Sequence, residues 1–418
     1  MKAIINANVF DGKNRKLKEN ATIIIDKNII KEITNDNISL ENFEEVIDAG
    51  NRTVIPGLID NHVHIATASN IRGEARVDEE VVHGVRTARD MLLRGFTTVR
   101  DAGGVIYGIK KGIDEGIIDG PRIFPSNAYI SQTCGHGDLR SSRADYRVTD
   151  GLYTSAKIMG GRTYIADGVS EMLRAVREQL FLGASQIKIM AGGGVASMYD
   201  PIGTIQFTYE EMKAAVDAAA DYGTYVMAHL YTNESMQRAA RAGVKSFEHG
   251  QLLDEETAKI IQDKEIFINP CPNFKSEEEE KTSFDDPIRR QKGLLIRKGV
   301  EKQTELINKY ELKLLFGTDY VEGLTCGIKQ SQDLSSYKEK FGSYKGLVSA
   351  TGNANEIIKL TTYQNPYPEG KIGVLEEGAF ADLLIVEGNP VEDLDILADP
   401  YRNIKLIMKN AEIYKNTL

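Results

Sequence analysis

Apolar segments of strand length alternate with segments of helical periodicity through most of the chain. Helical patterns such as 209–222 and 233–242 separate these apolar segments. Strands that alternate with helices form parallel sheets, and eight such units close into a barrel. The pattern therefore predicts an α/β fold with a (β/α)8 TIM-type barrel. Its strands are expected at 54–64, 96–101, 122–130, 186–190, 225–229, 245–249, 266–270 and 312–319.

Both ends of the chain have a different pattern, in which short β-prone runs are separated by turn residues. Such runs fill residues 1 to about 55, and similar runs return at 378–386 and 404–408. Asp-Gly dipeptides such as Asp11-Gly12 are typical of turns between strands. We expect residues 1–56 and 366–418 to form one small β-sandwich domain, with residues 57–365 forming the barrel.

Composition and charge exclude several classes of partner. The net charge of −10 argues against nucleic acid, since phosphate binding requires clustered Lys and Arg. No apolar run reaches the ~18 residues needed to span a bilayer, and the N-terminal residues lack the pattern of a signal peptide. Cys134, Cys271 and Cys326 are widely spaced and odd in number, which is typical of reduced thiols. We therefore expect a cytoplasmic protein without a membrane or nucleic-acid partner. A homo-oligomer is also expected, although the sequence does not give its number of subunits.

Four of the six histidines close a predicted strand, and the eighth strand ends in a carboxylate. On a strand, residues two apart point to the same side, so a His-x-His pair presents two imidazoles together. The carboxyl ends of barrel strands converge on the active-site mouth. Imidazole and carboxylate are ligands for divalent metals. The predicted cluster consists of His62, His64, His229, His249 and Asp319.

Lys188 lies inside an apolar run, where a charged ammonium would face a large desolvation cost. One interpretation is a lysine whose amine reaches the barrel mouth along its aliphatic stem. The other is a carbamate, formed from neutral Lys188 and carbon dioxide, which can bridge two metal ions. The surrounding histidines favour the carbamate.

This ordered set of residues, within eight βα units and a split terminal sheet, resembles the amidohydrolase superfamily. The segment 370–373, followed by 377–383, is similar to that superfamily's return strand into its small sheet domain. Segments 131–138 and 229–232 resemble the binuclear dipeptidases, both the prolidase-like ones and the Xaa-Arg(Lys) carboxypeptidase-like ones.

The resemblance implies a site with two divalent metal ions. His62, His64 and Asp319 would hold the more buried ion, His229 and His249 the more exposed one, and carbamylated Lys188 would bridge them. Zinc is the expected metal for these ligands, with manganese and cobalt as alternatives.

The resemblance also implies catalytic roles. A hydroxide bridging the metal ions would attack the amide carbonyl, and Tyr231 would donate a hydrogen bond to the developing oxyanion. Asp319 would carry the proton to the leaving nitrogen. His136, on the long segment 131–170, would contact the substrate carboxylate; the alternative is a hydrogen bond within the loop.

The expected substrate is a dipeptide or an N-acyl amino acid, best an L-Xaa-L-Pro dipeptide or one with an apolar C-terminal residue. This expectation rests on four arginines of the long segment, which favour an anionic or neutral substrate: Arg140, Arg143, Arg147 and Arg162. Alternatives are a carboxypeptidase for C-terminal Arg or Lys, an imidazolonepropionase-like hydrolase of cyclic amides, and a non-enzymatic barrel relative. Thr232 stands where adenosine-type deaminases carry a glutamate, which argues against a deaminase.

Overall fold

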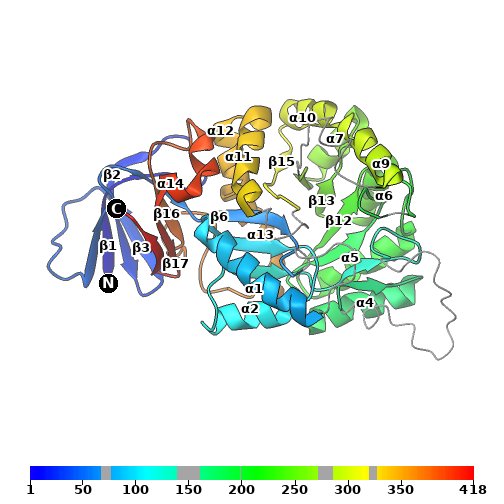
Figure 1. Cartoon of the computed structure of the whole chain (residues 1–418), viewed down its shortest axis with the longest axis horizontal. Helices are drawn as coiled ribbons and strands as arrows, with labels where there is room; N and C mark the ends of the chain where they lie inside the picture. The colour runs from blue at the N-terminus through cyan, green and yellow to red at the C-terminus, as the bar shows by residue number, and fades with distance from the viewer. Residues whose placement is uncertain (67–76, 139–160, 198, 272–285, 320–326) are drawn as a thin grey trace.

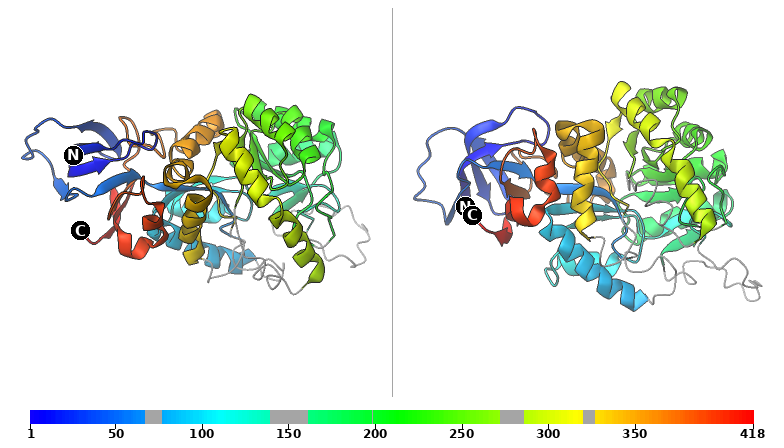
Figure 2. Two further views of the ribbon diagram at one scale, coloured as in Figure 1. Left: turned by 90° about the horizontal axis from the view of Figure 1, so that it is seen from above. Right: turned by 45° about the horizontal axis from the view of Figure 1, so that its top comes forward.

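The protein consists of a larger α/β body and a smaller sheet at one end of its long axis (Figure 1). The computed structural model describes all residues of the chain except 67–76, 139–160, 198, 272–285 and 320–326. Both chain termini lie on the small sheet, as the two further views also show (Figure 2). The small sheet is therefore built from both ends of the chain, as the sequence predicts.

The small sheet has eight strands, in the order β18-β17-β16-β5-β1-β2-β3, with β4 paired to β1. The N-terminal and C-terminal halves meet where β5 pairs antiparallel with β16. This sheet is consistent with the predicted β-sandwich. Its strands are β1 Lys2–Val9, β2 Lys18–Asp26, β3 Ile29–Thr34, β4 Glu45–Asp48, β5 Thr53–Pro56, β16 Leu383–Val386, β17 Ile404–Lys409 and β18 Glu412–Asn416.

The larger body contains parallel strands in two sheets, and most of their residues are buried, as expected where helices cover a parallel sheet. A three-stranded sheet has the order β6-β7-β8, and a seven-stranded sheet has the order β10-β9-β11-β12-β13-β14-β15. The strands are β6 Leu58–Val63, β7 Phe96–Asp101, β8 Arg122–Pro125, β9 Tyr129–Ser131, β10 Thr163–Ile165, β11 Ile187–Met190, β12 Val226–Leu230, β13 Ser246–His249, β14 Phe267–Asn269 and β15 Lys313–Leu314.

Backbone hydrogen bonds connect both edges of the three-stranded sheet to the seven-stranded sheet. Beyond β15, the Phe316 carbonyl accepts from Asn61 N–H at 2.8 Å, and Asp319 N–H donates to the His62 carbonyl at 2.8 Å. At the other edge, Ser185 N–H, just before β11, donates to the Pro125 carbonyl at 2.7 Å. These contacts join the two sheets and bring Asp319 beside the end of β6.

Helices alternate with the strands and cover the outside of the sheets (Figure 1). Local signals explain several of their starts: Thr208 and Glu211 form a capping box at α5, and Thr232 caps α6. The helices are α1 Val77–Leu93, α2 Tyr107–Asp114, α4 Val169–Phe181, α5 Tyr209–Asp221, α6 Asn233–Ala242, α7 Glu255–Asp263, α9 Pro287–Arg297, α10 Val300–Lys309, α11 Gly327–Phe341, α12 Ser343–Ser349, α13 Gly352–Ile358 and α14 Pro400–Asn403, with 3-10 turns η1 Lys359–Gln364 and η2 Leu394–Ala398.

The third predicted strand, 122–130, is divided into β8 and β9. Asn127 between them has a left-handed backbone (φ 56°), and its side-chain amide donates to the carbonyls of Gln179 and Leu182. Asparagine adopts this conformation more readily than most residues, so the chain bends here. Among the described residues, no helix has the length and apolarity needed to cross a membrane.

Candidate metal centre

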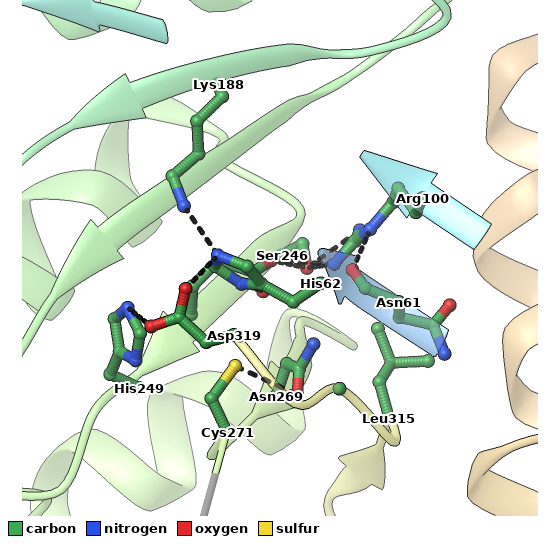
Figure 3. Close-up of polar contacts among 12 residues, drawn as sticks. Asn61, His62, Arg100, Lys188, Ser246, His249, Asn269, Cys271, Leu315 and Asp319 are labelled. Atoms are coloured by element: carbon green, nitrogen blue, oxygen red, sulfur yellow. Dashed lines mark hydrogen bonds and ion pairs between the residues drawn. The ribbon is translucent and has the colours of Figure 1, made fainter. Parts of the chain in front are cut away.

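The residues predicted to hold metal come together at the carboxyl ends of the parallel strands. His62 lies on β6, Lys188 on β11, His229 on β12 and His249 at the end of β13. His64 directly follows β6, and Asp319 lies in the segment after β15. Figure 3 shows His62, Lys188, His249 and Asp319 reaching one cluster from separate parts of the chain. All but Asp319 are nearly fully buried.

Asp319 lies at the centre of this cluster. Its Oδ1 is 3.3 Å from His62 Nε2 and 3.3 Å from His64 Nε2, and its Oδ2 is 3.8 Å from His249 Nε2. Lys188 Nζ lies 3.3 Å from His62 Nε2 on another side (Figure 3). Donor atoms of His62, His249 and Asp319 all lie within 4.8 Å of one another. The arrangement offers nitrogen and oxygen donors around a common centre, as a divalent metal requires.

His229 and Tyr231 extend the cluster along β12. The His229 ring centroid is 4.5 Å from that of His249, and its Nε2 is 3.2 Å from the Gly193 carbonyl. The Tyr231 ring is buried and stacks on His249 at 5.2 Å between centroids. Tyr231 therefore lies directly beside two of the predicted ligands.

His136 lies against His229, with stacked rings 4.1 Å apart. Its Nδ1 is 2.8 Å from Ser197 Oγ and 3.2 Å from Asp200 Oδ2. Asp200 is buried and is held by the backbone N–H of Gly194 at 2.7 Å. The predicted substrate contact of His136 stays a prediction, but its ring is at the site and is fixed there by the loop after β11.

Metal binding requires neutral imidazoles and an ionised carboxylate. The pKa shifts of His62, His229, His249 and Asp319 favour these states, whereas at His64 the effect of burial is outweighed by Asp319, which raises the pKa of His64. Burial lowers the pKa of His62 and His229 well below the usual value and lowers the pKa of His249 to about 4. Burial opposes ionisation of Asp319, yet the nearby His62 and His64 rings keep the pKa of Asp319 below its ordinary value.

Carbamate formation at Lys188 requires an uncharged amine, and a lowered pKa favours that form. Burial lowers the pKa of Lys188. Among the described residues, no carboxylate lies within ion-pair distance of its Nζ. The residues present therefore fit a centre in which Lys188 supplies a carbamate, although the carbamate itself stays a prediction.

Two residues of the cluster have strained backbones. His249 and Asp319 adopt positive φ angles of 75° and 51°. Such conformations cost of order 1–3 kcal/mol in non-glycine residues and concentrate at functional sites. Here they turn both side chains toward the cluster.

The structure also reveals buried charged residues that the sequence-based reasoning missed. Glu248, next to His249, accepts from His62 Nδ1 at 2.7 Å and from Arg100 Nη2 at 2.8 Å. Asp60 accepts from Thr318 Oγ1 at 2.7 Å and from Gln330, and so anchors the segment that leads to Asp319. Glu248, Arg100 and Asp60 all carry the signal that singled out Lys188, a charged residue inside an apolar β-run.

A second group of donor atoms, from His62, Glu248 and Cys271, also lies within 4.8 Å. Glu248 is already paired with Arg100 in this group, and the Cys271 thiol lies 3.4 Å from Asn269 Oδ1 (Figure 3). Asp319 provides the better carboxylate for a metal.

Arg162 does not support the expectation of an anionic or neutral substrate. Arg162 is buried and donates to Glu80 Oε2 at 2.8 Å, which places its charge in an ion pair with helix α1. The other three arginines expected to favour such a substrate lie outside the described residues; they are Arg140, Arg143 and Arg147.

Known proteins resemble the chain over nearly its whole length. It is 34% identical to a prolidase solved in complex with N-methylphosphonate-L-proline, with a TM-score of 0.90 and 99% of each chain covered. It is 31% identical to a Xaa-Pro dipeptidase solved with bound methionine, with a TM-score of 0.82, covering 99% of this chain and 100% of the other. It is 29% identical to ochratoxinase of Aspergillus niger over 395 residues, covering 87% of this chain and 75% of the relative.

The model of the Amidohydrolase family matches residues 53–415, from the last N-terminal strand of the small sheet to its final C-terminal strand. The match includes every residue of the cluster described above. The chain belongs to the Amidohydrolase family and is a metal-dependent amidohydrolase.

Proposed function

We propose that the protein is a binuclear dipeptidase that cleaves L-Xaa-L-Pro dipeptides, or dipeptides with another apolar C-terminal residue. The observation that carries the proposal is the convergence of His62, His64, His249 and Lys188 around Asp319. The likeness to a prolidase and to a Xaa-Pro dipeptidase, each at more than 30% identity, supports the substrate class.

In this proposal His62, His64 and Asp319 would hold one divalent ion, His229 and His249 would hold the other, and Lys188 would contribute a carbamate to the centre. Zinc is the expected metal. The ions would make a water molecule more acidic and polarise the amide carbonyl.

The chain's own residues would perform the remaining steps. Asp319, whose carboxylate lies at the centre of the cluster, would accept a proton from the attacking water and pass it to the leaving nitrogen. Tyr231, stacked on His249, would donate its phenol hydrogen bond to the developing oxyanion.

His136 would position the substrate. Its Nδ1 faces Ser197 and Asp200, and no hydrogen bond from Nε2 to a described residue competes for a substrate group. A contact to the substrate carboxylate would hold the scissile bond beside the cluster, which lowers the entropy cost of reaction.

The architecture that accompanies this function is a closed (β/α)8 barrel of residues 57–365 and a β-sandwich domain of residues 1–56 and 366–418. The hydrogen bonds from Asn61 to Phe316 and from Asp319 to His62 support barrel closure. Cytoplasmic localisation and a homo-oligomeric state stay predictions.

Amino-acid release from a dipeptide library, sorted by C-terminal residue, tests the function on the zinc-loaded full-length protein. Release from Xaa-Pro or other apolar-ending dipeptides is expected. Preference for C-terminal Arg or Lys would contradict the proposed substrate class but would agree with metal-dependent hydrolysis of a dipeptide. No release from any dipeptide would refute the dipeptidase and favour N-acyl or cyclic amides as substrates.

A further inference from the structure

The His62 ring is held from behind by a buried carboxylate. Its Nδ1 lies 2.7 Å from Glu248 Oε2, whereas its Nε2 faces Lys188 and Asp319. Both His62 and Glu248 have side chains no more than 1% exposed. The two nitrogens of the ring therefore have separate tasks, one toward the barrel interior and one toward the site.

Glu248 is itself held by a polar layer below the site. Arg100 Nη2 donates to Glu248 Oε1 at 2.8 Å, and Ser246 Oγ donates to the same oxygen at 2.6 Å. Ser246 and Glu248 are two residues apart on β13 and so point to the same side. Figure 3 shows Arg100 on the side of His62 opposite Lys188 and Asp319.

Arg100 joins strands that are far apart in the sequence. Its Nε donates to the Asn61 carbonyl at 2.7 Å, and its Nη1 donates to Tyr225 Oη at 3.1 Å and to Ser246 Oγ at 3.1 Å. A buried carboxylate without such a partner would be costly. Arg100 therefore keeps Glu248 in place as a pure hydrogen-bond acceptor.

An acceptor at Glu248 Oε2 decides the tautomer of His62. An ionised carboxylate can only accept, so the proton must be on His62 Nδ1 and the lone pair on Nε2. A metal ligand needs this lone pair. His64 obtains the same orientation from a backbone group, because its Nδ1 lies 2.8 Å from the Gly103 carbonyl. Of these two ring contacts, only that of His62 depends on a replaceable side chain.

We propose that Glu248, held by Arg100 and Ser246, is a positioning residue that presents His62 Nε2 to the metal. This inference rests on the proposed metal centre. A charged acceptor behind a ligand histidine also makes the ring a stronger donor, and such partners typically contribute 10–100-fold to metal affinity.

Glu248→Gln tests the role with almost no change of shape. If the amide oxygen faces Arg100, the NH₂ group faces His62 and favours the tautomer with a protonated Nε2. If the oxygen faces His62, the NH₂ group opposes the Arg100 and Ser246 donors. Both arrangements weaken the presentation of Nε2.

The measurement is zinc retained by the loaded full-length protein against increasing concentrations of a chromophoric chelator. Glu248→Gln should bind zinc 10–100-fold more weakly than wild type. The matched control is Asp382→Asn, which disrupts another buried arginine–carboxylate pair, Arg122–Asp382, at the junction with the small sheet. The control should lower thermal stability and leave zinc affinity unchanged. If Glu248→Gln does not fold, Ser246→Ala, which removes one hydrogen bond to Glu248, should show a smaller loss of affinity in the same direction.

Wild-type zinc affinity in folded Glu248→Gln would overturn the positioning role. If Glu248→Gln does not fold, wild-type zinc affinity in Ser246→Ala would overturn it. An equal loss of affinity in Asp382→Asn would overturn it too, since the loss would then follow from general destabilisation. A wild-type protein that binds no zinc would overturn the proposed metal centre and this inference with it, which separates the two failures.

Discussion

Replacing Gly194 by alanine should displace His136 from the site. A Cβ built at Gly194 lies 1.9 Å from His136 Cε1 and 2.0 Å from its Nδ1, whereas ordinary contacts begin at 3.4 Å. The loop that carries Gly194 is anchored on both sides, because its N–H donates to Asp200 and its carbonyl accepts from Lys292 Nζ at 3.0 Å. The imidazole, at the far end of a side chain, is therefore the part that must move.

The expected size of the effect follows from these distances. Restoring an ordinary contact needs a ring displacement of about 1.5 Å, the difference between 3.4 Å and 1.9 Å. A misplacement of about 1 Å in a positioning group can cost about 100-fold in rate, which corresponds to about 2.7 kcal/mol. We expect kcat/KM for a Xaa-Pro dipeptide to fall by about that factor, while zinc content stays at the wild-type value.

A matched control and a double-mutant cycle make this prediction specific. Gly203 belongs to the same loop, and a Cβ there would meet no atom within 4 Å, so Gly203→Ala should keep wild-type activity. Adding Gly194→Ala to a His136→Ala background should change little, because the overlapping ring is gone. Full activity of Gly194→Ala, or additive losses in the double variant, would refute the role of His136.

Three further predictions concern the centre and the fold. Lys188→Ala should abolish hydrolysis and lower the metal content per chain, and a short carboxylic acid with bicarbonate should restore part of the activity; full activity with two metals would exclude the carbamate. Burial lowers the pKa of Lys409 from 10.5 to about 8, while its Nζ donates to the Gly120 carbonyl. Between pH 8 and 10.5 the unfolded chain binds more protons at Lys409 than the folded protein, so the free energy of unfolding should rise by up to about 3 kcal/mol over this range. Denaturant titrations should show this rise in wild type. The same rise in Lys409→Met would contradict its assignment to Lys409. Gly57→Ala places a Cβ 2.0 Å from Thr97 Oγ1 and should cost about 1–3 kcal/mol by thermal unfolding, with Thr97→Ala relieving the loss and additive losses contradicting the overlap.

The alternation of strands and helices could be predicted because it follows from local hydrophobic periodicity. The strand β7 and the helix α6 have the predicted bounds. Differences occur where tertiary contacts override the pattern. Asn127 divides the third strand, and the eighth predicted strand forms a regular ladder only at Lys313–Leu314, since the residues beyond it bond partly to strand β6 and helix α12.

The cluster of candidate ligands could be predicted because the carboxyl ends of neighbouring parallel strands lie together whatever the loops do. Arg162 could not be placed in the same way, since its partner Glu80 lies on a helix far away in sequence. Glu248 and Arg100 were detectable as charges within apolar runs, but their pairing with His62 depends on the register of three strands. Sequence spacing alone does not provide that register.

The most direct test of the central claim is proline release from a Xaa-Pro dipeptide by the full-length protein, before and after metal depletion and after zinc is returned. We predict hydrolysis by the zinc-loaded protein, loss of activity on depletion, and recovery with zinc. An unchanged rate after verified depletion, or no proline release from the zinc-loaded protein, would contradict the assignment of this cluster as the metal centre of a prolidase-like enzyme.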